Sequence, residues 1–109
     1  MRKIAANNNY ITKVRLSLDK LEVLELASNA ITAVPNLAAM PRLKVLNLVH
    51  NKIKSIDIDF LPLTNSLEKL YLAQNEIAFY SRGTMRAWVA NMKKMNKLEE
   101  MTIHTNPFV

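Results

Sequence analysis

The sequence predicts an α/β solenoid, a stack of similar coils in which each coil adds one short strand to a parallel sheet. The first observation is a recurring segment: LEVLELASNAI, LKVLNLVHNKI, LEKLYLAQNEI and LEEMTIHTNPF begin at Leu21, Leu43, Leu67 and Leu98. The second is an asparagine at a matching place near the end of each segment. The third is that the connecting stretches are short, except for the last one. We therefore expect the sheet on a concave face, short helices or 3-10 turns on the convex face, and a longer helix in the last repeat.

The recurring asparagines set the period of the stack. A degraded copy of the segment, MRKIAANNNYI, begins at Met1. The asparagines fall 20, 22, 24 and 31 residues apart, at Asn9, Asn29, Asn51, Asn75 and Asn106. Periods of 20–29 residues with the pattern L-x-x-L-x-L-x-x-N-x-L are the signature of leucine-rich repeats. The chain resembles that family, in its short 22-residue subfamily, over nearly its whole length, which implies one domain of about five repeats over residues 1–109.

The asparagines are expected to have a structural role. A buried amide without partners costs about 1–3 kcal/mol, so an asparagine between leucines needs a reason. The chain turns sharply after each strand and leaves backbone groups inside, and the amide offers two donors and an acceptor. The resemblance implies that the five asparagines form a ladder that binds these groups.

The outward-pointing positions of the strands define the candidate binding surface. Alternate strand residues point to opposite faces of a sheet, so Val23, Val45, Val49 and Tyr71 lie together on the concave face, with Ala27 and Ala73. A polar rim surrounds them, formed by Glu25, Asn47, His50, Lys69 and Gln74. An apolar centre with an aromatic anchor and a polar rim is typical of a protein interface. The alternative is that valine is present for its strand propensity.

The last connecting stretch, residues 82–97, predicts the longer helix. Met85, Trp88, Val89, Met92 and Met95 form an apolar stripe at helical spacing, and Thr84 is the expected N-cap after Gly83. The stripe is expected to pack on the convex side of the solenoid, and a methionine-rich groove for a partner is the alternative. Pro107 removes a backbone donor and is expected to end the array. We expect neighbouring chains or missing segments to cover both ends.

Composition excludes several kinds of chemistry. The chain has no cysteine and one glycine, which excludes thiolate sites and argues against a glycine-rich nucleotide loop. His50 and His104 lie two repeats apart, about 10 Å at the usual strand spacing, which is too far for a shared metal. No nucleophile lies beside a base, so we expect no enzyme activity, no cofactor and no small-molecule substrate. No apolar run is long enough to span a membrane, and a cytoplasmic location is expected.

The net charge of +6 fits either a solvated basic surface or an acidic partner. Dense basic clusters with aromatics are absent from the sequence, so direct binding of nucleic acid is not expected. We expect a non-enzymatic scaffold that binds a protein partner on its concave face.

One family member offers a more specific comparison. The segment NSLEKLYLAQNEI and the final KLEEMTIHTNPF are similar to the leucine-rich light chain of axonemal outer-arm dynein. That resemblance implies an axonemal or other cytoskeletal assembly. The alternatives are a regulatory subunit of a protein phosphatase and a subunit of an RNA-processing complex.

Overall fold

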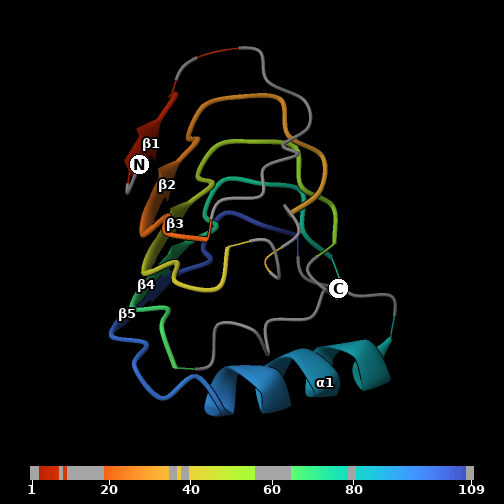
Figure 1. The fold of residues 1–109 in the computed structure, drawn as a ribbon. Helices are drawn as coiled ribbons and strands as arrows, with labels where there is room; N and C mark the ends of the chain where they lie inside the picture. The colour runs from red at the N-terminus through yellow and green to blue at the C-terminus, as the bar shows by residue number, and fades with distance from the viewer. Residues whose placement is uncertain are drawn as a thin grey trace.

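The computed structural model describes residues 3–7, 9, 19–34, 37, 40–55, 65–78 and 81–107. Within these residues the chain forms five strands and one helix: β1 (Lys3–Ala5), β2 (Val23–Glu25), β3 (Val45–Asn47), β4 (Lys69–Tyr71), α1 (Arg82–Lys93) and β5 (Glu100–Thr102). The strands form one parallel sheet in chain order, β1-β2-β3-β4-β5. Figure 1 shows the sheet along one side of the stack, the return segments on the other side, and α1 beside the last coil. The predicted solenoid with a parallel sheet is confirmed.

The register of the sheet follows the repeat. Val23 pairs with Val45, which pairs with Lys69, which pairs with Glu100. Each middle residue of β2, β3 and β4 is buried, whereas the two residues beside it are only partly buried. The alternation arises because the leucine between two outward positions points into the stack.

Backbone pairing continues for several residues after each strand. The amide of Leu26 donates to the Asn47 carbonyl at 2.8 Å, and the amide of Ser28 donates to the Val49 carbonyl at 2.9 Å. The same two bonds recur one coil later, from Leu48 to Tyr71 and from His50 to Ala73. The coils therefore stay aligned up to the corner where the chain leaves the sheet.

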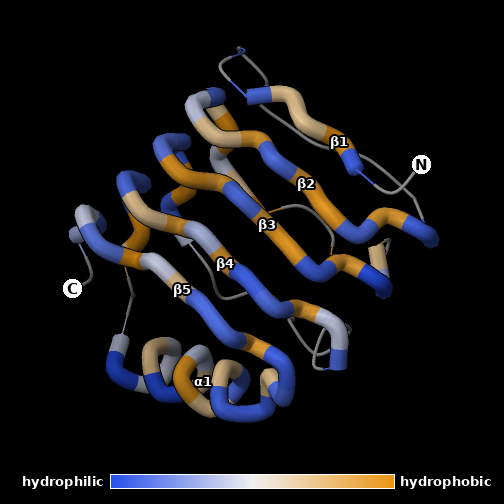
Figure 2. The backbone as a smooth tube through the Cα atoms, turned by 90° about the vertical axis from the view of Figure 1, so that its left-hand side faces the viewer, coloured by the Kyte–Doolittle hydropathy of each residue, from blue (hydrophilic) through white to orange (hydrophobic). Residues whose placement is uncertain are grey.

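The core runs through the middle of the stack. Its members are the leucines of the repeats together with apolar residues from the return segments. The completely buried ones are Leu21, Leu24, Ile31, Met40, Leu43, Leu46, Leu48, Ile53, Leu67, Leu70, Leu72 and Ile77. Figure 2 shows hydrophobic residues along β2 and β3 and a more hydrophilic β5, whose sequence is Glu-Met-Thr. The core is thus best covered at the middle strands, and Met101 of β5 is one of the exposed large apolar side chains.

The helix α1 begins earlier than the sequence suggested. Ser81, not Thr84, is the N-cap: the Ser81 side chain accepts from the Thr84 amide, and the Thr84 side chain accepts from the Ser81 amide. This reciprocal pair is a capping box, so the expected cap at Thr84 was wrong by one turn. The helix ends at Lys93 rather than continuing to residue 97.

The apolar stripe of α1 packs only in part. Trp88 and Met95 are buried in the core, and Met92 packs against it. Val89 is 40% exposed, so it lies outside the contact. The predicted short helices or turns of the third return segment fall on residues 56–64, which lie outside the described residues. Among the described residues, no helix is long and apolar enough to cross a membrane.

Candidate protein-binding face and the asparagine ladder

The asparagine ladder is clearest at Asn51, which is 6% exposed. Its Nδ2 group donates to the Leu48 carbonyl of its own turn at 3.0 Å and to the Leu26 carbonyl of the preceding turn at 3.0 Å. Its Oδ1 atom accepts from the Ile31 amide at 3.1 Å. The amide therefore satisfies backbone groups of two consecutive coils.

The same arrangement repeats along the stack. Asn75 donates to the Leu72 and Leu48 carbonyls and accepts from the Ile53 amide at 3.1 Å. Asn106 donates to the Ile103 and Leu72 carbonyls and accepts from the Ile77 amide at 3.0 Å. One carbonyl such as that of Leu48 thus accepts from two successive asparagines, which makes the ladder continuous.

The ladder changes at its first members. Asn29 donates to the Leu26 and Ala6 carbonyls, as the pattern requires. Its Oδ1 atom accepts from the backbone amide of Asn9 at 3.1 Å. Asn9 is exposed and donates within its own turn, to Ala6 and Asn7. The degraded first copy therefore keeps the local bonds of the corner on an exposed asparagine.

A strained backbone position precedes each of the last four ladder asparagines. Ser28, His50, Gln74 and Thr105 have φ angles of 57°, 58°, 57° and 58°. This left-handed region is uncommon for residues other than glycine. The backbone amides of Ser28, His50 and Gln74 each donate to a carbonyl of the next coil. The left-handed conformation allows this bond to form while the asparagine that follows turns into the stack.

The concave face brings the predicted apolar residues together. Val23 and Val45 are register partners on β2 and β3, and both are partly buried. Val49 lies further along the β3 coil, beyond the outward-facing Asn47, and its carbonyl accepts from the Ser28 amide. Ala73, on the β4 coil, is 2% exposed. Val23 and Val45 therefore form an apolar pair across β2 and β3, and the polar register pair Glu25 and Asn47 lies between this pair and Val49.

Tyr71 lies toward β5. Its hydroxyl donates to Oε2 of Glu100 at 2.7 Å. That hydrogen bond, followed by burial and the negative charge of Glu100, raises the pKa of Tyr71 above its usual 10.0. The aromatic anchor is thus held over the β4–β5 side of the face.

The polar rim contains both paired and unpaired charges. Glu25 lies 3.6 Å from the ammonium of Lys3, an exposed contact that contributes little stability. Lys69 forms no ion pair within the described residues, although its register partner is Glu100. His50 lies 3.3 Å from the Ser28 hydroxyl through Nδ1, and Gln74 is exposed beside the ladder. Asn47 accepts from the Val49 amide at 3.1 Å through its side chain, which fixes its orientation.

Sequence reasoning missed the role of Glu100. The register pairs Glu100 with Lys69 and pairs Tyr71 with Thr102. The signal that could have found the contact is the diagonal relation between Tyr71 and Glu100, since diagonal neighbours on adjacent strands lie within reach of an aromatic side chain.

The described residues hold no group of three or more histidine, cysteine, aspartate or glutamate side chains placed to bind a metal ion. His50 and His104 bond instead to nearby hydroxyl groups, those of Ser28 and Thr105.

Comparison with known proteins agrees with this geometry. The family model described as "Leucine Rich repeats (2 copies)" matches residues 19–63 and 41–82. Podocan from Mus musculus is 37% identical over 84 residues, which cover 71% of this chain and 13% of podocan. The chain thus spans a small part of the length of the curated relative that it matches.

Proposed function

Because the chain belongs to the leucine-rich repeat family, we propose that it is a non-enzymatic scaffold that binds a protein partner on its concave face. Leucine-rich repeats are typical of protein–protein interaction, and extended concave surfaces are what stacked repeats use for it. The observation that carries the proposal is the outward-facing apolar pair Val23 and Val45 at the centre of the sheet, with Val49 further along the β3 coil. Its polar rim completes the usual anatomy of an interface.

The whole of residues 1–109 is proposed as one leucine-rich repeat domain. The short repeat length supports the 22-residue subfamily, and the strand of β4, Lys-Leu-Tyr, supports a place in a dynein-associated cytoskeletal assembly of the cytoplasm. The second candidate setting is a phosphatase-regulatory or RNA-processing complex, in which the solenoid would hold a protein partner.

The test is affinity purification of the intact protein followed by mass spectrometry, with the wild type compared against Val49→Glu. We expect the change to remove the specifically bound proteins, because a buried carboxylate in an apolar interface is costly. The matched control is Val89→Glu on α1, which alters an exposed valine away from the concave face. Circular dichroism must remain native for both variants. Equal recovery from Val49→Glu and from wild type would place the binding site elsewhere.

The identity of the recovered proteins separates the settings. Dynein heavy chain, phosphatase subunits and splicing subunits each correspond to one of them. Direct nucleic-acid binding would instead give an affinity that falls steeply with salt.

A further inference from the structure

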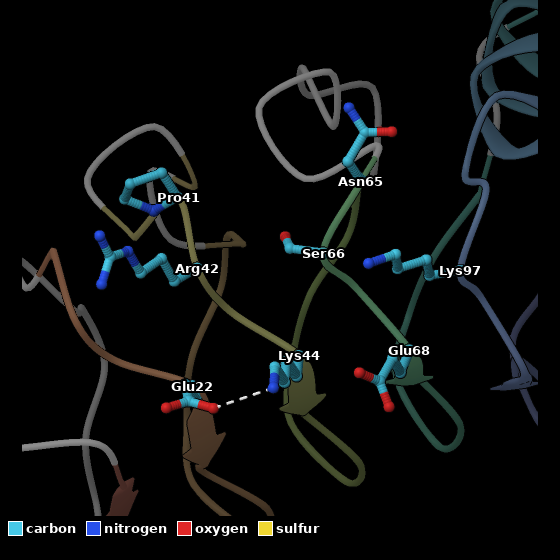
Figure 3. Close-up of a pocket in the computed structure, with 8 residues that line it drawn as sticks. All are labelled: Glu22, Pro41, Arg42, Lys44, Asn65, Ser66, Glu68 and Lys97. Atoms are coloured by element: carbon cyan, nitrogen blue, oxygen red, sulfur yellow. Dashed lines mark ion pairs between the residues drawn. The ribbon is translucent and has the colours of Figure 1, made fainter.

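A groove lies where the strands begin, at the end of the sheet opposite to the asparagine ladder. Its volume is about 350 Å³. Glu22, Lys44 and Glu68 directly precede β2, β3 and β4 and line one wall, and residues 41–42, 65–66 and Lys97 line the rest. Figure 3 shows these side chains arranged along consecutive coils, with the Lys97 ammonium pointing toward Ser66.

The groove is rich in hydrogen-bond donors. The Oδ1 atom of Asn65 accepts from Asn96 at 2.7 Å, which leaves its Nδ2 group on the side of the groove (Figure 3). The hydroxyl of Ser66 is buried and has no hydrogen-bond partner. Buried hydroxyls in native folds nearly always have a partner, and this hydroxyl would reach an acceptor in the groove only after a rotation of the side chain.

Some charged side chains of the groove form ion pairs and others do not. Lys44 is bound to Glu22 at 3.1 Å. Arg42 and Lys97 form no ion pair within the described residues, and neither does Glu68. Three cations and two carboxylates line the groove, so its formal net charge is +1, which balances a singly charged anion rather than a doubly charged phosphate.

We propose that this groove binds a carboxylate of a peptide segment, with Lys97 and Asn65 as its donors and Arg42 as a further cation. The carboxylate would accept from the Lys97 ammonium and the Asn65 Nδ2 group, and a change of rotamer at Ser66 would let its hydroxyl donate as well. The groove has room for a side chain together with part of its backbone. Its wall residues directly precede three strands of the sheet. The inference rests on the proposed protein-binding function and adds an acidic residue to what the partner must carry.

The test is a titration of the isotope-labelled full chain, followed by backbone amide NMR, with a terminally blocked Gly-Glu-Gly peptide. We expect saturable shifts at residues 66 and 97 and much smaller ones with Gly-Gln-Gly. Lys97→Met should weaken binding about tenfold, as expected for the loss of one charge-assisted hydrogen bond. Ser66→Ala should weaken it less. Lys52→Met, which changes an exposed lysine outside the groove, is the matched control and should bind like wild type.

Three results would overturn the proposal. They are the absence of saturable shifts, equal binding of the glutamine peptide, and unchanged binding by Lys97→Met. Acetate and inorganic phosphate test the other sources of an anion, and two further results would also overturn the proposal. Equal binding of acetate would show that the peptide backbone is not recognised, and tighter binding of phosphate would show that the site is not built for a single charge. The variant Val49→Glu should leave the peptide titration unchanged, so failure of the groove and failure of the concave face can be told apart.

Discussion

The side-chain amide of Asn51 shows how a recurring asparagine stabilises the turn at which the chain leaves the sheet. It donates to carbonyls of two coils and accepts from an amide of one, and it does so while buried. The sequence was sufficient to predict this position, because an asparagine that recurs among leucines at a fixed period indicates that its amide binds the backbone. The left-handed residues beside it were not predictable, because Ser28, His50, Gln74 and Thr105 share no residue type. Their conformation is imposed by the pairing of neighbouring coils.

We predict that Asn51→Ala lowers the free energy of unfolding by about 1–3 kcal/mol, since the buried Ile31 amide loses its acceptor and the Leu26 and Leu48 carbonyls each lose one of two asparagine donors. Urea denaturation followed by circular dichroism measures the change. Asn9→Ala is the control, and its effect should be smaller because Asn9 is exposed and bonds within its own turn. Losses of equal size at the two positions would contradict a ladder that depends on burial.

The hydroxyl of Tyr71 supplies a prediction about pH. Its pKa in the folded protein is raised above 10.0, mainly by the hydrogen bond to Glu100. A raised pKa in the folded state means that the associated stability is present below pH 10 and is lost as the pH rises through the folded-state pKa. We expect Glu100→Ala to lower the pKa of Tyr71, since both the acceptor and the negative charge are removed.

A pH titration of tyrosinate absorbance measures this shift, and Tyr71→Phe identifies the signal of Tyr71. Glu100→Gln should lie between wild type and Glu100→Ala, because it keeps an acceptor and loses the charge. An identical Tyr71 titration in wild type and Glu100→Ala would show that the hydrogen bond is absent in solution.

At the scale of the element, the strands were easier to predict than the helix ends. The strands follow from the L-x-L pattern, whose register is the same in every coil. The start of α1 was misplaced because Ser81 and Thr84 are both good capping residues. Their reciprocal bonds make Ser81 the cap and place Thr84 inside the first turn, with Gly83 also helical. The apolar stripe also predicted that Val89 packs on the solenoid, whereas Val89 is exposed. Helical spacing determines which residues share a face, but it does not determine how many of them reach the core.

The cap of α1 can be tested directly. We predict that Ser81→Ala costs about 1 kcal/mol of stability, because the Thr84 amide loses its acceptor. Urea unfolding measures the loss. Val89→Ala, at an exposed site on the same helix, should change stability by less than about 0.5 kcal/mol. A neutral Ser81→Ala together with a costly Val89→Ala would mean that the helix begins and packs differently in solution.

For the whole molecule, the decisive property is that each coil pairs only with its neighbours in the sheet order. Stability in such a stack is a sum of coil terms and nearest-neighbour terms. The middle coils have two neighbours and the fully buried leucines, whereas β1 pairs only with β2 within the described residues. Opening of the structure should therefore begin at an end of the sheet and not at its centre.

Hydrogen exchange of backbone amides tests this order. We expect the Leu48 amide, which is bonded to the Tyr71 carbonyl at 2.9 Å, to exchange much more slowly than the Ala6 amide, which is bonded to the Glu25 carbonyl at the same distance. The two bonds have the same length, so the comparison isolates position in the stack. Equal opening free energies at the two amides would mean that the chain unfolds as a single unit.

The ladder also accounts for how the chain accommodates unequal coil lengths. Asn51 and Asn75 are 24 residues apart and Asn75 and Asn106 are 31 apart, yet Asn75 and Asn106 accept from the preceding coil at 3.1 and 3.0 Å. The extra residues of the longer interval include α1, which lies beside the last coil and outside the sheet (Figure 1). Additional length between two strands can therefore form a separate element without changing the bonds that hold the strand ends together.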